Sequence, residues 1–165
     1  MNVEEFDKKL NESFNRFDLS EKEFLTDILL LKPKGMVHDL SDDFLIDLYN
    51  NFVLSGRTIG FGFNNELIDN GKFLFFASQD PFDIGIDKGN GNIIMWDQEW
   101  ARIHYRLAPD LDTFLEIILE IYDHGLPGWF EEKKYTNEDR KGLFSKIEKI
   151  LDKEYLGYYQ ESYGN

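Results

Sequence analysis

Residues 72–124 read KFLFFASQDPFDIGIDKGNGNIIMWDQEWARIHYRLAPDLDTFLEIILEIYDH, and their pattern predicts four strands followed by one helix. Residues 73–77 form a short apolar run, which is typical of a central strand covered on both faces. In residues 83–87 two isoleucines alternate with Asp, Gly and Asp, so we expect one inward apolar face and one outward acidic face. The GNGN of residues 89–92 tolerates positive φ and favours a hairpin turn into residues 93–97.

The clearest alternation follows in the fourth predicted strand, residues 100–107. It predicts a shared inward face for Ala101, Ile103, Tyr105 and Leu107 and an outward face for Arg102, His104 and Arg106. After Pro109, Asp110 or Asp112 can cap a helix whose apolar residues recur at helical spacing. We expect Gly125 and Pro127 to end that helix.

Elements before and after this stretch are predicted to be mainly helical. Upstream, residues 1–17 have amphipathic spacing, Ser20 opens a second helix, and Ser41 is expected to cap a third. A strand is predicted over residues 57–64, where bulky residues alternate with glycine. Asn137 is expected to cap the last helix.

These signals predict an α+β fold: one domain over residues 1–165 with a twisted, mainly antiparallel β-sheet flanked by α-helices. Residues 1–35 would form a helical N-terminal extension. Residues 156–165 have no periodicity and are expected to form a flexible tail.

The composition excludes several classes of protein. The chain contains no cysteine, which rules out disulfides, thiolate nucleophiles and thiolate metal sites. It has no N-terminal apolar run typical of a signal peptide and no apolar stretch long enough for a membrane span. We therefore expect a cytoplasmic protein that does not interact with membranes.

Negative charge is concentrated in the middle of the chain. The net charge is −14, and residues 36–124 carry 16 acidic against 5 basic side chains, which gives −11. Such a field repels nucleic acid and attracts basic proteins. The alternative interpretation is a solvated acidic surface that keeps the protein soluble.

Motifs for catalysis, cofactors and metals are incomplete. Gly60 and Gly62 resemble half of a dinucleotide loop, but the third glycine is missing and no helix follows. The acids and asparagines of residues 80–92 miss the spacing of a calcium loop. We therefore predict no cofactor, no metal and no catalytic set.

The hairpin ends bring acids and indoles together. Folding at residues 89–92 predicts one protein-binding patch formed by Asp80, Asp83, Asp87, Trp96, Asp97, Glu99 and Trp100. The alternative is that these are scattered, solvated turn residues.

The order of motifs resembles the SUKH superfamily, the SMI/KNR-type proteins. The matching segments are SDDFLIDLYNN at residues 41–51, FLFFA at 73–77, FDIGID at 82–87, YRLA at 105–108 and DTFLEII from Asp112. Many bacterial members of this superfamily are immunity proteins that neutralise a cognate polymorphic toxin, commonly a nuclease or deaminase. The resemblance therefore implies a non-enzymatic antitoxin with an α+β fold and a protein toxin as its partner. The acidic middle segment predicts that this toxin is basic.

Two other functions stay open on the sequence alone. One is a regulatory or scaffold module of the same fold that has no toxin partner. The other is a small hydrolase that uses Asp97 and Glu99, which would require a concave pocket holding both carboxylates.

Overall fold

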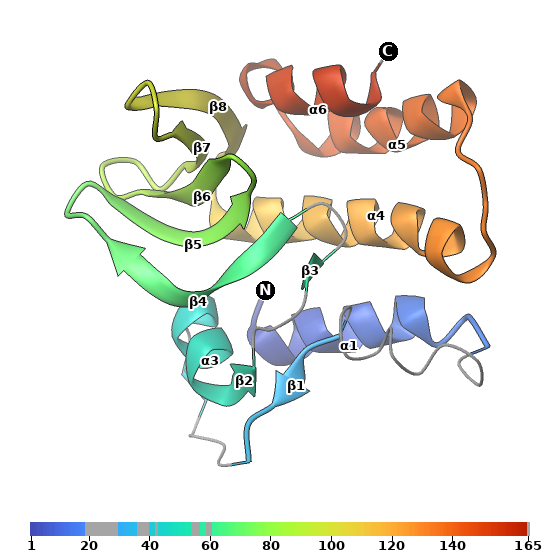
Figure 1. The fold of residues 1–165 in the computed structure, drawn as a ribbon, viewed down its shortest axis with the longest axis horizontal. Coiled ribbons are helices and arrows are strands. Elements are labelled where there is room, and N and C mark those ends of the chain that lie inside the picture. The colour runs from blue at the N-terminus through green and yellow to red at the C-terminus, as the bar shows by residue number, and fades with distance from the viewer. Residues whose placement is uncertain (19–29, 36–39, 42, 54–56, 59–60, 165) are drawn as a thin grey trace.

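The computed structural model describes residues 1–18, 30–35, 40, 41, 43–53, 57, 58 and 61–164 (Figure 1). Its strands are β1 (Lys32–Pro33), β2 (Phe52–Val53), β3 (Arg57–Thr58), β4 (Phe61–Asp69), β5 (Phe73–Gln79), β6 (Phe82–Asp87), β7 (Ile93–Asp97) and β8 (Arg102–Ala108). Strands β3 to β8 form one sheet in sequence order, every described pair is antiparallel, and β1 pairs separately with β2. The predicted α+β class with an antiparallel sheet is confirmed.

The helices lie on one side of the sheet. They are α1 (Val3–Phe14), α3 (Phe44–Asn51), α4 (Leu111–Phe130), α5 (Asn137–Ile150), the 3₁₀ helix η1 (Lys153–Tyr155) and α6 (Gly157–Tyr163). Figure 1 shows α4 between α1 and α5, which explains why its buried residues cover a wide arc. No described helix is long and apolar enough to cross a membrane. The second predicted helix, from Ser20, falls mainly on residues 19–29 and lies outside the described residues.

The central strand β5 is buried on both faces, as the apolar run predicts. Phe76 and Ala77 belong to the main core between the sheet and the helices. Phe73 and Phe75 belong instead to a second cluster on the other face of the sheet, together with Ile94. The register shifts at Phe76, and this bulge places two consecutive residues in the main core.

Two register shifts in β8 overturn the predicted alternation there. Ile94 pairs with Arg106 and Met95 with Tyr105, but the next pair joins Trp96 to Ile103, so His104 is an extra residue in β8. Because a one-residue slip moves side chains to the other face, Ile103 packs in the outer cluster. Tyr105 packs against the main core. The prediction that these two residues share a face was therefore wrong.

Helix α4 continues past Pro127, where the sequence predicts its end. The hydroxyl of Tyr135 accepts from the Gly128 amide at 2.9 Å and donates to the His124 carbonyl at 2.5 Å. The hydroxyl thus takes the place of a direct hydrogen bond from the Gly128 amide to the His124 carbonyl. The neighbouring Pro127 has no amide hydrogen to donate. A Cβ at position 128 would lie 2.7 Å from the Tyr135 ring, so any residue other than glycine would displace that ring. The helix reaches Phe130.

The first turn of α3 is capped differently from the prediction. Asp43 rather than Ser41 is the N-cap, and its carboxylate accepts from the amides of Leu45 and Ile46 at 3.0 and 3.1 Å. The Ser41 hydroxyl is engaged elsewhere, since it donates to the buried carboxylate of Asp47 at 2.9 Å. Two acidic side chains therefore fix the start of α3.

The C-terminal segment is helical instead of flexible. Tyr158 and Tyr159 of α6 are buried in the main core. The Tyr159 hydroxyl donates to the Leu107 carbonyl at 3.1 Å, and the Tyr105 hydroxyl donates to Glu161 at 2.6 Å. These contacts attach α6 to β8, so the prediction of a flexible tail was wrong.

Candidate protein-binding surface

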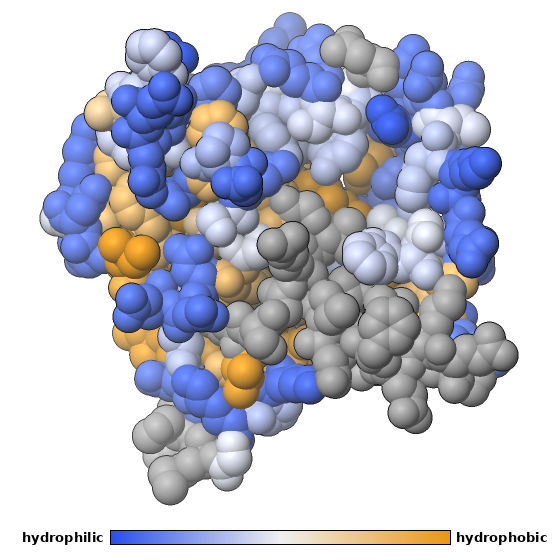
Figure 2. All heavy atoms as spheres, viewed as in Figure 1, coloured by the Kyte–Doolittle hydropathy of each residue, from blue (hydrophilic) through white to orange (hydrophobic). Residues whose placement is uncertain are grey.

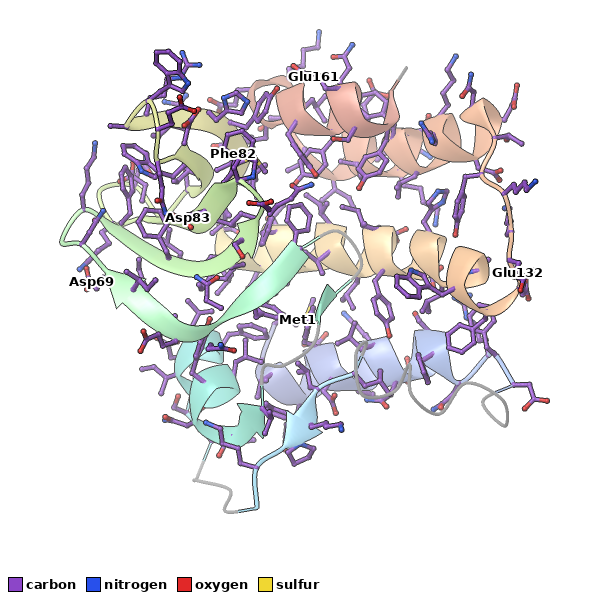
Figure 3. The ribbon with its side chains drawn as sticks, viewed as in Figure 1. Met1, Asp69, Phe82, Asp83, Glu132 and Glu161 are labelled. Atoms are coloured by element: carbon purple, nitrogen blue, oxygen red, sulfur yellow. The ribbon has the colours of Figure 1, made fainter. Side chains whose placement is uncertain are left out.

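Two turns meet at one end of the sheet. Strands β6 and β7 are neighbours, and Asp83 is opposite Trp96 in their register. Consequently the β5–β6 turn at residues 80–81 and the β7–β8 turn at residues 98–101 emerge from the same end of the sheet. Residues 80–83 and 96–101 are called the acidic tip below. Figure 3 labels Asp83 at the beginning of β6.

A side-chain hydrogen bond fixes these two turns to each other. The amide of Gln98 donates to the carboxylate of Asp83 across the tip. Gln98 was not among the predicted site residues, because a single glutamine in a turn carries no sequence signal of its own. The bond constrains the β7–β8 turn, which also holds Ala101 at a φ of 47°.

The four acids of the tip differ in their surroundings. Asp80 and Glu99 are exposed, whereas Asp83 is half-buried. Asp97 is 8% exposed, and its carboxylate accepts from the Trp100 amide at 3.1 Å. Asp97 therefore shapes the turn from inside, and Asp80 and Glu99 are the acids that a partner can reach directly.

Asp87 lies outside the acidic tip. It shares a strand face with Asp83 but follows it by four residues, which is roughly 13 Å along a strand. Its carboxylate accepts from the Gly89 amide at 3.0 Å in the opposite turn, where Lys88 also pairs with Asp69 at 2.9 Å. The structure thus brings six of the seven predicted site residues to one end of the sheet and separates the seventh.

The two indoles of the tip have different environments. Trp96 is half-buried and lies 4.9 Å from the ring of Phe73, so it covers the outer cluster of the sheet. Trp100 is 66% exposed. An exposed indole on a turn fixed by two hydrogen bonds is available to a partner at low entropic cost.

The charge of the tip is negative. Asp80, Asp83, Asp97 and Glu99 carry it, and Arg102 is the neighbouring cation, opposite Asp97 in the register. Further along β8, Arg106 lies 3.8 Å from Glu154. The acidic tip therefore presents an excess of carboxylates to solvent.

A polar cavity beside β8 is lined by a histidine. It measures about 350 Å³ and is lined by His104, Tyr105, Arg106 and Glu154, among others. The His104 ring stacks on Phe82 at 4.6 Å, which accounts for its position. The Glu161 carboxylate, as acceptor of the Tyr105 hydroxyl, raises the pKa of Tyr105 to about 12. This tyrosine therefore stays protonated at neutral pH.

The described residues contain no group of three or more His, Asp or Glu side chains that could hold a metal ion. Asp97 and Glu99, the pair that a hydrolase would use, lie in unlike surroundings, one buried within its own turn and the other exposed. No protein-family model, curated protein or solved structure matches the chain.

Proposed function

We propose that this chain is a SUKH-type immunity protein that binds a cognate protein toxin in the cytoplasm and neutralises it without catalysis. The resemblance of residues 41–122 to that superfamily supports the proposal. The matching motifs fall on α3, on strands β5, β6 and β8 of the antiparallel sheet, and on α4.

The observation that carries the proposal is the indole of Trp100, 66% exposed on the acidic tip. Large aromatic side chains at the centre of an interface commonly dominate its binding energy, and surrounding charges set the rate of encounter. The exposed indole offers apolar surface that a partner can cover. Trp100 together with the exposed carboxylates of Asp80 and Glu99 is therefore suited to an apolar and cationic partner surface.

The acidic charge indicates the class of toxin. A toxin that cleaves or deaminates nucleic acid has a basic surface, because its substrate is a polyanion. An inhibitor with carboxylates at its binding surface gains association rate and complementarity against such a toxin. Residues 36–124 of this chain carry 16 acids against 5 bases, which is the negative charge expected of such an inhibitor.

A growth assay with co-purification separates immunity from regulation. The domain encoded by the adjacent gene serves as the candidate toxin and is expressed in cells with and without the chain. Immunity requires that the chain restores growth and elutes with the toxin as a complex. A complex without restored growth would favour the regulatory or scaffold function, and neither complex nor growth would reject the immunity function.

A further inference from the structure

A second surface lies on the opposite side of the sheet, toward its other end. Leu74 and Ile86 are partners in the β5–β6 register and face the helices, whereas Asp83 of the acidic tip faces away from them. Together with Leu45, Ile46 and Leu111 they line a groove of about 560 Å³, called the α3 groove below. Its volume is within the range of about 300–1,000 Å³ that is typical of binding sites.

The α3 groove is apolar and open. Leu74, Ile86 and Leu111 are half-buried around it, and Ile46 on its wall is 49% exposed. Figure 2 shows apolar surface near α3 and β4 interrupted by hydrophilic side chains. An aliphatic or aromatic side chain entering the groove would remove this apolar surface from water.

The rim of the groove is acidic because three helices begin there. Asn2, Asp43 and Asp112 line its opening, and they belong to the N-terminal turns of α1, α3 and α4. Each of these helices carries acids at its start: Glu4 and Glu5, Asp43 and Asp47, and Asp110 and Asp112. Asp112 is 66% exposed and pairs with the Met1 amino group at 2.7 Å, so the two lining carboxylates and this amino group together leave a net negative charge at the rim.

We propose that the α3 groove binds a protein segment in which an apolar side chain is flanked by lysine or arginine. The apolar side chain occupies the groove, and the flanking cations meet the rim carboxylates. Charge repulsion disfavours a second copy of this chain as the occupant, since each copy carries −14. The inference is independent of the proposed immunity function, because a regulatory module would use the groove in the same way.

Three capped tripeptides test the proposal on the full chain by NMR chemical-shift mapping of backbone amides at low salt. Acetyl-Lys-Leu-Arg-amide carries both features, acetyl-Lys-Ser-Arg-amide lacks the apolar side chain, and acetyl-Glu-Leu-Glu-amide reverses the charge. We expect the first to shift the amides of Ile46, Leu74 and Leu111 at concentrations where the other two do not. Equal binding of the Glu-Leu-Glu peptide, or shifts confined to other regions, would overturn the proposal.

Two double variants test whether the rim carboxylates contribute to binding of the Lys-Leu-Arg peptide. Asp43→Asn keeps an N-cap that asparagine can supply, so combined with Asp112→Asn it removes two rim carboxylates without removing the cap, and it also releases the Met1 amino group from its ion pair. We expect this pair to weaken the Lys-Leu-Arg peptide on the order of threefold or more. Glu131→Gln with Glu148→Gln, exposed and distant in sequence, removes the same charge and should leave the affinity unchanged. Equal weakening by both pairs, or dimers in sedimentation, would contradict the proposal.

Discussion

The side-chain amide of Gln98 donates a hydrogen bond to the carboxylate of Asp83, and this bond joins the β7–β8 turn to the first residues of β6. Asp97 holds the same turn from inside through the Trp100 amide. The exposed indole of Trp100 therefore projects from a turn whose conformation is set before any partner arrives.

Replacing Gln98 with alanine tests that constraint. We expect the free energy of unfolding to fall by about 1 kcal/mol, because a hydrogen bond to a half-buried carboxylate is lost. Backbone hydrogen exchange at Trp100 should accelerate, since its amide is bonded within the turn. Urea unfolding and exchange NMR measure the two effects, and unchanged exchange at Trp100 would mean that Gln98 does not order the turn.

The two indoles of the acidic tip should respond in opposite ways to substitution. Trp100→Ala should leave the free energy of unfolding within about 0.5 kcal/mol of the parent, because the side chain is exposed. Its affinity for the toxin should fall by roughly 30-fold or more, as at an interface hot spot. Trp96→Ala is the control: it should cost about 2 kcal/mol of stability, because it uncovers Phe73. A loss of stability in Trp100→Ala with unchanged affinity would refute this assignment.

Much of the fold follows from local pattern, and the exceptions depend on contacts distant in sequence. Ile84 is fully buried as the alternation predicts, and β6 and β7 form the hairpin that GNGN favours. Helix α4 continues past Pro127 because the hydroxyl of Tyr135 bridges the Gly128 amide and the His124 carbonyl. Tyr158 lies in a seven-residue helix, too short for a helical period to be recognised.

For the candidate site, the sequence predicts which residues approach one another better than it predicts their exposure. Asp80 and Glu99 are exposed as expected, but the burial of Asp97 depends on how its turn closes, which spacing alone does not reveal. Asp87 has the same strand face as Asp83, and period two cannot distinguish the two ends of a strand. The α3 groove was not predicted, because it forms only where three helix starts meet the sheet.

Tyr135→Phe should destabilise the last turns of α4. The substitution leaves the His124 carbonyl and the Gly128 amide without the hydroxyl that joins them, which we expect to cost about 1–2 kcal/mol. Urea unfolding measures this cost. The double variant Pro127→Ala with Tyr135→Phe provides the control. Without the proline, the Gly128 amide can donate directly to the His124 carbonyl. If Tyr135→Phe costs the same in the parent as in the Pro127→Ala variant, the hydroxyl does not compensate for the proline.

The stability of the chain should decrease as the pH falls below about 7 because of His124. Burial lowers the pKa of its imidazole, while the nearby Asp139 carboxylate acts in the opposite direction. The unfolded chain, with a histidine pKa near 6.5, therefore binds the proton before the folded chain does, and acidification favours unfolding. The loss begins near the unfolded pKa and levels off below the lowered folded pKa.

His124→Gln removes this titration, so its unfolding free energy should depend less steeply on pH between about 7 and 5 than that of the parent. Urea denaturation at each pH compares the two proteins. Parallel curves would show that His124 is not responsible for the dependence.

The most direct measurement for the central claim is the rate at which the chain associates with its toxin after reversal of the exposed tip charges. Asp80→Lys with Glu99→Lys avoids the buried Asp97, and Glu131→Lys with Glu148→Lys makes the same change in charge at exposed sites outside the tip. We expect stopped-flow association of the tip variant to slow by roughly tenfold at low salt, with a smaller effect at high salt, and the control to stay near the parent rate. Equal rates for parent and tip variant, with protection of growth unchanged, would contradict the claim that the acidic tip binds the toxin.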